Sequence, residues 1–143
     1  MEPATRRPGW DEREKPMEPP CRVRVYKGYE SIRRALDDIK EAIYAYNVVA
    51  SSRGYYLKPV HKVYKRVGEL TRVYEYYGRY WWRKGDSKLI YAGRVKPRGL
   101  PEPPQNPLEG LSVIREGDDV IIDCETYERF RDLFKGLLAE RVP

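Results

Sequence analysis

The stretch RYWWRKGDSKLIYA, residues 79–92, is the part of the sequence that predicts the fold most directly. Two runs of mostly aromatic and aliphatic residues flank the polar segment at residues 84–87, which contains a glycine. Apolar runs separated by a short glycine-containing turn are typical of a β-hairpin. We therefore expect two antiparallel strands here, joined by a tight turn.

This hairpin also predicts which aromatic side chains face water, because side chains alternate between the two faces of a strand. Arg79, Trp81 and Arg83 share one face, and Tyr80 and Trp82 share the other. Two arginines are rarely buried together, so we expect the face with Trp81 to be exposed. On this interpretation Tyr80 and Trp82 pack inward, and Trp81 offers a flat ring to the solvent.

Two elements are predicted towards the N-terminus. Residues 22–27 alternate with a period of two, which indicates a short strand, and the apolar residues after Gly28 recur at helical spacing as far as Gly54. The core face of this long helix would hold Ile32, Ala35, Leu36, Ile39, Ala42, Ile43, Tyr46 and Ala50. Tyr44 and Val48 lie on its opposite face, where they could contact a second copy of the chain or a large neighbouring element.

A second helix is expected between Pro59 and Gly78, since proline is tolerated at the first position of a helix. One stripe at helical spacing comprises Val60, Val63, Val67, Leu70, Tyr74 and Tyr77. Lys58, Lys62, Lys65, Glu69, Arg72 and Tyr76 form a nearly opposite stripe. On this interpretation Lys62, Lys65 and Arg72 share an exposed helix face that would extend a basic track beside the hairpin.

The remaining segments complete the predicted domain. Residues 97–110 hold five of the twelve prolines and form a connector, and residues 111–115 and 119–122 indicate a second hairpin. Asp123 is expected to cap a short helix, and residues 137–142 to form a last strand. Residues 1–20, with five prolines and alternating charges, are expected to be a disordered arm. The prediction is one α+β domain over residues 21–143, a mostly antiparallel, curved sheet with about three helices.

Composition indicates the cellular environment in which the protein is expected to work. No apolar run is long enough for a transmembrane helix, and the first residues do not resemble a secretory signal, so we expect a cytoplasmic protein. The low Asn, Gln and Met content and the high share of charged residues resemble those of thermophile proteins. Cys21 and Cys124 are the two cysteines, which excludes a multi-disulfide framework; a single bridge between them stays open.

The charge of the chain is unevenly distributed. Its 143 residues carry a net charge of +6, but residues 53–98 hold 13 basic and 3 acidic side chains, whereas residues 99–143 hold 5 and 10. The basic stretch also contains 8 of the 13 tyrosines and 2 of the 3 tryptophans. Positive charge and flat aromatic rings together are what bind the phosphates and unpaired bases of single-stranded nucleic acid.

The sequence offers little for catalysis. There is no glycine-rich phosphate-binding loop, and His61, the single histidine, has no metal ligand or triad partner at a suitable spacing. An acidic group could hold Mg²⁺ for phosphodiester cleavage, although turn and cap chemistry accounts for each member: Glu116, Asp118, Asp119, Asp123 and Glu125. We expect a non-catalytic protein without metal or cofactor, and keep a small Mg-dependent nuclease as an alternative.

The function expected from these observations is largely sequence-independent binding of single-stranded DNA or RNA. The side chains expected to carry it are Trp81, Arg79, Arg83, Lys88, Tyr91, Lys62, Lys65 and Arg72. Trp81 would stack on bases, and the cations would contact phosphates. A duplex-binding accessory factor and a protein–protein adaptor that uses the proline-rich connector are further alternatives.

The chain resembles the ThermoDBP family and its ThermoDBP-related relatives, which are archaeal proteins that bind single-stranded nucleic acid. The resemblance covers residues 21–143 and rests on a helical N-terminal half, YWWR at 80–83, KLIY at 88–91 and VIID at 120–123. It implies an antiparallel sheet with helices and a basic, hydrophobic cleft that holds unpaired strands. ThermoDBP proteins proper add a C-terminal leucine zipper, whereas this chain has no heptad repeat and looks more like the related group. Residues 80–97 also look loosely like basic hairpins in integrase and transposase arms, which bind duplex.

Overall fold

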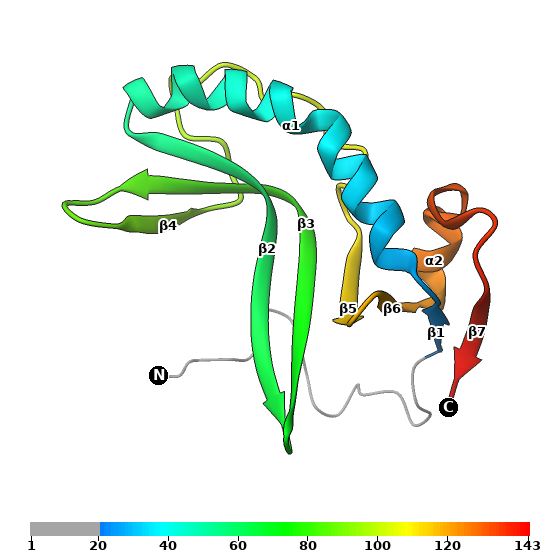
Figure 1. The fold of residues 1–143 in the computed structure, drawn as a ribbon. Coiled ribbons are helices and arrows are strands. Elements are labelled where there is room, and N and C mark those ends of the chain that lie inside the picture. Colours follow the sequence, from blue (N-terminus) through cyan, green and yellow to red (C-terminus); the bar gives the residue numbers. More distant parts are fainter. Residues whose placement is uncertain (1–20) are drawn as a thin grey trace, which may run out of the picture.

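The computed structural model describes residues 21–143 (Figure 1), so the arm expected over residues 1–20 lies outside the described residues. The elements follow the order β1 (Arg22–Val25), α1 (Gly28–Ser52), β2 (Tyr55–Val67), β3 (Leu70–Lys84), β4 (Leu89–Gly93), β5 (Ser112–Glu116), β6 (Asp119–Asp123), α2 (Cys124–Arg129) and β7 (Ala139–Val142). A short 3₁₀ turn, Arg131–Phe134, follows α2.

The seven strands of residues 21–143 form one sheet in which every neighbouring pair is antiparallel. The strand order is β2-β3-β5-β6-β1-β7, and β4 pairs with the last residues of β3. The predicted α+β domain with a mostly antiparallel sheet is therefore confirmed. The expected number of helices is wrong, because this part of the chain holds two α-helices and not about three.

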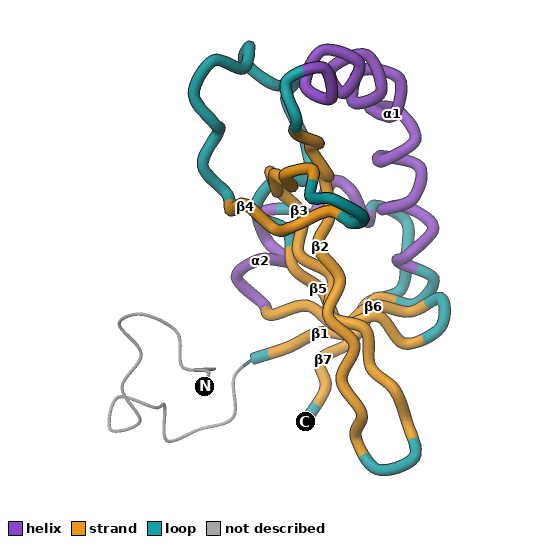
Figure 2. The backbone as a smooth tube through the Cα atoms, turned by 90° about the vertical axis from the view of Figure 1, so that its left-hand side faces the viewer, coloured by secondary structure: helices purple, strands orange, loops and turns teal. Residues whose placement is uncertain are grey.

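The missing helix is the one expected between Pro59 and Gly78, a segment that forms most of the β2–β3 hairpin. Gly68, with a φ of +62°, opens a two-residue turn that brings Val67 opposite Leu70. Glycine adopts this left-handed conformation without steric cost, and hairpins favour it at the first turn position. The segment is also rich in Val and Tyr, which favour strands. The turn end of the hairpin projects past the rest of the sheet (Figure 2).

The β2–β3 hairpin bends at Pro59. Lys58 pairs with Tyr80 and Val60 pairs with Tyr77, so Pro59 faces two residues of β3 in a β-bulge. Bulges bend a strand and increase its twist. Proline has no N–H to give to a neighbouring strand, and it is tolerated at an edge strand or a bulge. Figure 1 shows the two strands turning a corner at this level.

The proline-rich connector fixes this corner through one buried side chain. The amide nitrogen of Asn106 donates to the carbonyl oxygen of Gly78 at 3.2 Å and more weakly to that of Pro59 at 3.4 Å. The carbonyl of the same side chain accepts from the backbone N–H of Leu108 at 2.9 Å. Carbonyl groups left without a ladder partner at the bulge are thereby satisfied, as buried polar groups must be.

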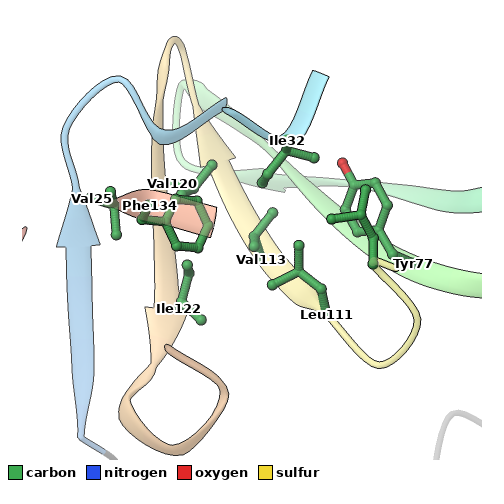
Figure 3. Close-up of a cluster of buried hydrophobic side chains, with 9 residues drawn as sticks. Val25, Ile32, Tyr77, Leu111, Val113, Val120, Ile122 and Phe134 are labelled. Carbon is green, nitrogen blue, oxygen red and sulfur yellow. The ribbon is translucent and has the colours of Figure 1, made fainter. Parts of the chain in front are cut away.

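Helix α1 arches over the outer side of the corner (Figure 1) and covers one face of the sheet. The long helix expected after Gly28 is confirmed. One hydrophobic cluster lies under its N-terminal half, between β1, β3, β5 and β6, and Figure 3 shows most of its side chains: Val25, Ile32, Tyr77, Leu111, Val113, Val120, Ile122 and Phe134. A second cluster lies under its C-terminal half: Ile43, Tyr46, Ala50, Leu57, Trp81 and Leu100. We call this the covered face of the sheet, and the opposite one the open face.

The outer side of α1 carries Tyr44 and Val48, the two residues for which a contact with a second copy of the chain or a neighbouring element is expected. Tyr44 is 62% exposed and Val48 is 72% exposed, so no element of residues 21–143 covers them. A contact with a second copy of the chain stays a prediction. Neither α-helix of the described range has the length and apolar composition needed to cross a membrane.

A disulfide joins the residue before β1 to the first residue of α2. Cys21 and Cys124 are bonded, with their Cα atoms 5.4 Å apart, which settles the pairing left open by the sequence. The backbone N–H of Cys124 also donates to the carbonyl oxygen of Cys21 at 2.9 Å, continuing the β1–β6 ladder by one step.

Candidate functional site

Trp81 lies on the covered face, so the expectation that it is exposed is wrong. Its side chain is 1% exposed and packs in the second cluster, opposite Leu57 and under α1. The two flanking arginines did not keep Trp81 out of the core, because long arginine side chains reach past a buried neighbour to the surface. Arg79 pairs there with Glu109 of the connector, with Nε 3.2 Å from the carboxylate, and Arg83 is exposed.

The open face carries the aromatic cluster, which we define as His61, Tyr80, Trp82 and Tyr91. The ring centroid of His61 is 5.4 Å from that of Tyr80 and 5.8 Å from that of Tyr91. Trp82 meets Tyr91 edge-on at 5.3 Å. The expectation that Tyr80 and Trp82 face away from Trp81 holds, but they lie on the open face and not in the core under α1. Tyr80 is buried there, as expected, and Trp82 is half-buried.

Three strands and the corner assemble this cluster. Trp82 of β3 pairs with Tyr91 of β4, whereas His61 lies on β2 two residues after Pro59, which faces the bulge, and its ring reaches Tyr80 across the bend. Because Tyr80 and Trp82 alternate with Trp81, which packs under α1, the cluster lies on the side of the corner away from that helix; Figure 1 shows the corner and the helix over its outer side. Tyr91 is its most accessible ring, at 45% exposed, whereas Tyr80 is buried. Burial raises the pKa of Tyr80 above its ordinary value.

Cations surround these rings. Lys58 Nζ lies 4.8 Å from the centroid of the Trp82 ring, and the guanidinium carbon of Arg94 lies 5.7 Å from that of Tyr80. One step along the hairpin, Lys84 Nζ lies 5.4 Å from the centroid of the Tyr56 ring. Cation–π contacts of this kind hold a positive charge at the surface without neutralising it. Among residues 21–143, none of these three cations has an acidic partner within 4 Å.

Three of the predicted cations are occupied by ion pairs. Arg79 pairs with Glu109, and Arg72 Nε lies 3.3 Å from the carboxylate of Glu116. Lys62 Nζ lies 3.8 Å from Glu75, a fully buried carboxylate that also accepts a hydrogen bond of 2.6 Å from the Tyr77 hydroxyl. Burial and this bond raise the pKa of Tyr77. These pairs weaken the case for phosphate contacts by Arg79, Arg72 and Lys62.

Lys62, Lys65 and Arg72 do not share a helix face. They lie on β2 and β3, where Lys65 stands directly opposite Arg72 in the projecting part of the hairpin. Lys88 lies in the β3–β4 turn and lines a shallow hollow of about 410 Å³ with Tyr56 and Lys84. Of the predicted site residues, Tyr91 belongs to the aromatic cluster and Lys88 lies beside Lys84, whereas Trp81 lies on the covered face.

Sequence reasoning missed Tyr56, Lys58, His61, Lys84 and Arg94. Lys84 could have been found from the sequence, because alternation along the strand places it on the same face as Tyr80 and Trp82. Tyr56 and Lys58 could be assigned to the same face only with the β2–β3 register, which the expected helix precluded. His61 joins the cluster only because the chain bends at the bulge.

The acidic group does not form a metal centre. Arg24 pairs with Glu116 at 2.6 Å and with Asp119 at 3.1 Å, and Asp119 also accepts the backbone N–H of Lys27 at 2.9 Å. Among residues 21–143, no three acidic, histidine or cysteine side chains are placed to hold a metal together. The carboxylates serve the β5–β6 turn and the start of α1.

Asp123 caps α2 as expected, and its loss gives a modest stability prediction. Its carboxylate accepts from the Thr126 backbone N–H at 2.9 Å and from the Thr126 hydroxyl at 2.6 Å. Burial alone would raise the pKa of Asp123, but these hydrogen bonds outweigh it and hold the pKa below its usual value. Asp123→Ala is expected to lower the free energy of unfolding by about 1 kcal/mol.

The cap is a carboxylate, so its contribution depends on pH. Because its folded pKa is lowered, the stabilisation is complete above the unfolded pKa of about 4 and is lost as the pH falls through the folded value. Denaturant titrations of Asp123→Ala and the parent at pH 7 and near pH 2 would check this, and a difference that stays constant with pH would contradict it.

Comparisons with known proteins leave the family open: no family model, no curated protein and no solved structure matches this chain.

Proposed function

We propose that the protein binds single-stranded DNA or RNA, without catalysis and largely without sequence preference, through the aromatic cluster on the open face. The observation that carries this proposal is the combination of an accessible ring, Tyr91, with the unpaired cations Lys58, Lys84 and Arg94 around one uncovered surface. Unpaired bases stack on such rings, and phosphates meet the cations.

The open face suits unpaired strands better than duplex. In a duplex the base faces are stacked on one another and cannot stack on Tyr91 or Trp82. The cations lie beside the rings and not in a separate track, so that one nucleotide can use both. Lys88 lines the adjoining hollow with Tyr56 and Lys84 and would add a phosphate contact, because it has no acidic partner within 4 Å among residues 21–143. Arg83 shares the covered face with Trp81, and Lys65 lies in the projecting part of the hairpin, so neither belongs to the proposed site.

Tyr91→Ala is the first test. The substitution is expected to weaken binding of a labelled single-stranded oligonucleotide by about 1–3 kcal/mol, or roughly 5- to 150-fold in Kd, because one stacking platform is lost. Fluorescence anisotropy at two salt concentrations gives both the affinity and its salt dependence. The same titrations with single-stranded DNA, single-stranded RNA and a DNA hairpin compare the possible ligands.

The matched control is Tyr44→Ala. Tyr44 is also an exposed tyrosine with a lysine over its ring, Lys40 Nζ at 5.9 Å, but it lies on the outer side of α1. Its replacement should leave Kd unchanged. Equal losses in both variants would contradict the site, and tighter binding of the DNA hairpin would favour the duplex-binding alternative. Mg²⁺-dependent cleavage of the oligonucleotide would show that the protein is a nuclease. If no oligonucleotide bound even at low salt, the protein–protein adaptor would be the favoured alternative.

We also propose that the protein works in the cytoplasm of a thermophile. The composition supports a hot environment. The Cys21–Cys124 bridge is compatible with this proposal, since disulfides are rare in the cytosol of mesophiles but frequent in intracellular proteins of hyperthermophiles.

A further inference from the structure

A second feature of the open face is a hollow of about 380 Å³ beyond the aromatic cluster. Its lining comprises Arg22, Tyr74, Tyr76, Ser112, Val113, Ile114, Ile121 and Asp123. Tyr76 pairs with His61 across the β2–β3 ladder, so the hollow continues the surface that carries the cluster. Its volume is within the range of small-ligand sites.

The hollow has an apolar floor and aromatic walls. Ile114 and Ile121 are cross-strand partners on β5 and β6, and Tyr74 pairs with Ile114 from the other side. Both tyrosines are half-buried, and so their ring positions are constrained by the sheet. A flat, mostly apolar group would cover the isoleucines and lie against a tyrosine ring, which is the environment that unstacked bases occupy.

The polar side of the hollow is set by Arg22 and Asp123, which stand opposite each other on β1 and β6. Arg22 Nε is buried without a hydrogen-bond partner, and among residues 21–143 the guanidinium has no acidic partner within 4 Å. The Asp123 oxygens each accept one bond from Thr126 and keep room for another donor. The hollow thus offers unused donors beside an acceptor.

These charges balance, so they favour a neutral ligand with acceptors and donors on adjoining edges over a phosphate. Guanine fits this description best among the bases. Arginine pairs with two of its acceptors, O6 and N7, and a carboxylate accepts from its N1–H and N2–H₂ groups. We propose that the hollow is a guanine-binding subsite for one unstacked base of a bound strand. This inference rests on the proposed function for the origin of the base, but the subsite itself can be tested alone.

The test is a titration of the full chain with the 5′-monophosphates of guanosine, adenosine, cytidine and uridine, followed by amide NMR shifts. Ribose 5-phosphate is the control for the phosphate. We expect the guanosine nucleotide to shift the amides of Tyr74, Tyr76 and Ile114 and to bind at least about fivefold tighter than the others, since a good arginine–guanine pair contributes about 1–3 kcal/mol of discrimination. Equal shifts with ribose 5-phosphate, or none with any nucleotide, would overturn the proposal.

Two variants locate the binding. Arg22→Lys keeps the positive charge but lacks the planar fork, so it should lose the preference for guanosine nucleotide while the protein stays folded. Arg141→Ala removes a cation from the adjacent strand β7, where Arg141 pairs with Val23 of the covered face, and should change nothing. A preference that survives Arg22→Lys would overturn the assignment.

The subsite and the proposed function can fail separately. Arg22 is not part of the aromatic cluster, and Tyr91 does not line the hollow. Oligonucleotide binding that depends on Tyr91, together with no nucleotide shifts in the hollow, would refute the subsite and leave the function. Nucleotide binding that depends on Arg22, in a protein that does not bind oligonucleotides, would support the subsite and refute the proposed function.

Discussion

Trp81→Ala is expected to lower the free energy of unfolding by about 3–5 kcal/mol, the usual cost of truncating a large aromatic side chain in a core. Trp81 is buried between Leu57 and the C-terminal half of α1 and has no solvent-facing ring. The substitution leaves a cavity under the helix that the surrounding strands can fill only in part. Guanidinium titration followed by circular dichroism measures the change.

Two companion variants make this prediction specific. Trp81→Phe keeps most of the volume, and because the indole N–H of Trp81 has no hydrogen-bond partner, this change leaves no partner unpaired. It should therefore cost clearly less than Trp81→Ala. Tyr91→Ala should leave stability nearly unchanged and reduce oligonucleotide affinity. If Trp81→Ala unfolded like the parent and lost affinity instead, the tryptophan would belong to the binding surface.

Reduction of the Cys21–Cys124 bridge should destabilise the protein by about 2–5 kcal/mol. The bridge spans a sequence separation of 103 residues, so it removes many conformations from the unfolded chain. Thermal unfolding with and without a reductant, with free thiols counted after reduction, measures the effect. A melting temperature that is unchanged although both thiols are free would contradict it.

The double variant Cys21→Ser, Cys124→Ser is the control for this experiment. Its stability should match that of the reduced parent and should not respond to the reductant. A further loss in the double variant would mean that the sulfur atoms pack against α2 as well as crosslinking the chain.

Helices and strands whose local sequence pattern fits only one type of secondary structure could be predicted from the sequence. The β3–β4 and β5–β6 hairpins each have a glycine-containing turn between apolar runs, and α1 has a long stripe with a glycine at each end. Between Pro59 and Gly78 the apolar residues fit both the period of a helix and the period of a strand. Apolar residues three and four apart satisfy a helix, while the same valines and tyrosines satisfy two strands once Gly68 is a turn.

The candidate site was harder to predict because it depends on side-chain direction relative to elements distant in sequence. The hairpin of Trp81 was assigned correctly, but which of its faces α1 covers is a tertiary choice. The two arginines suggested that the face with Trp81 is exposed. That face is covered by α1, and Arg79 and Arg83 avoid burial because their side chains reach its edges. Basic and aromatic side chains of residues 53–98 do gather on the open face, where we propose that binding occurs, but most of them are not the residues expected from the sequence.

The position of β1 has a consequence for how the chain is made. Arg22 pairs with Asp123 on one side and with Val142 on the other, so both partners of this strand are synthesised about a hundred residues after it. Helix α1 and the β2–β3 hairpin rely on nearer neighbours and can form while the ribosome is still translating. Contacts that close such long loops form slowly. The strand made first is thus expected to join the sheet late, together with β7, which pairs with it alone, and the part of the open face on the β2–β3 hairpin is expected to form before the sheet is complete.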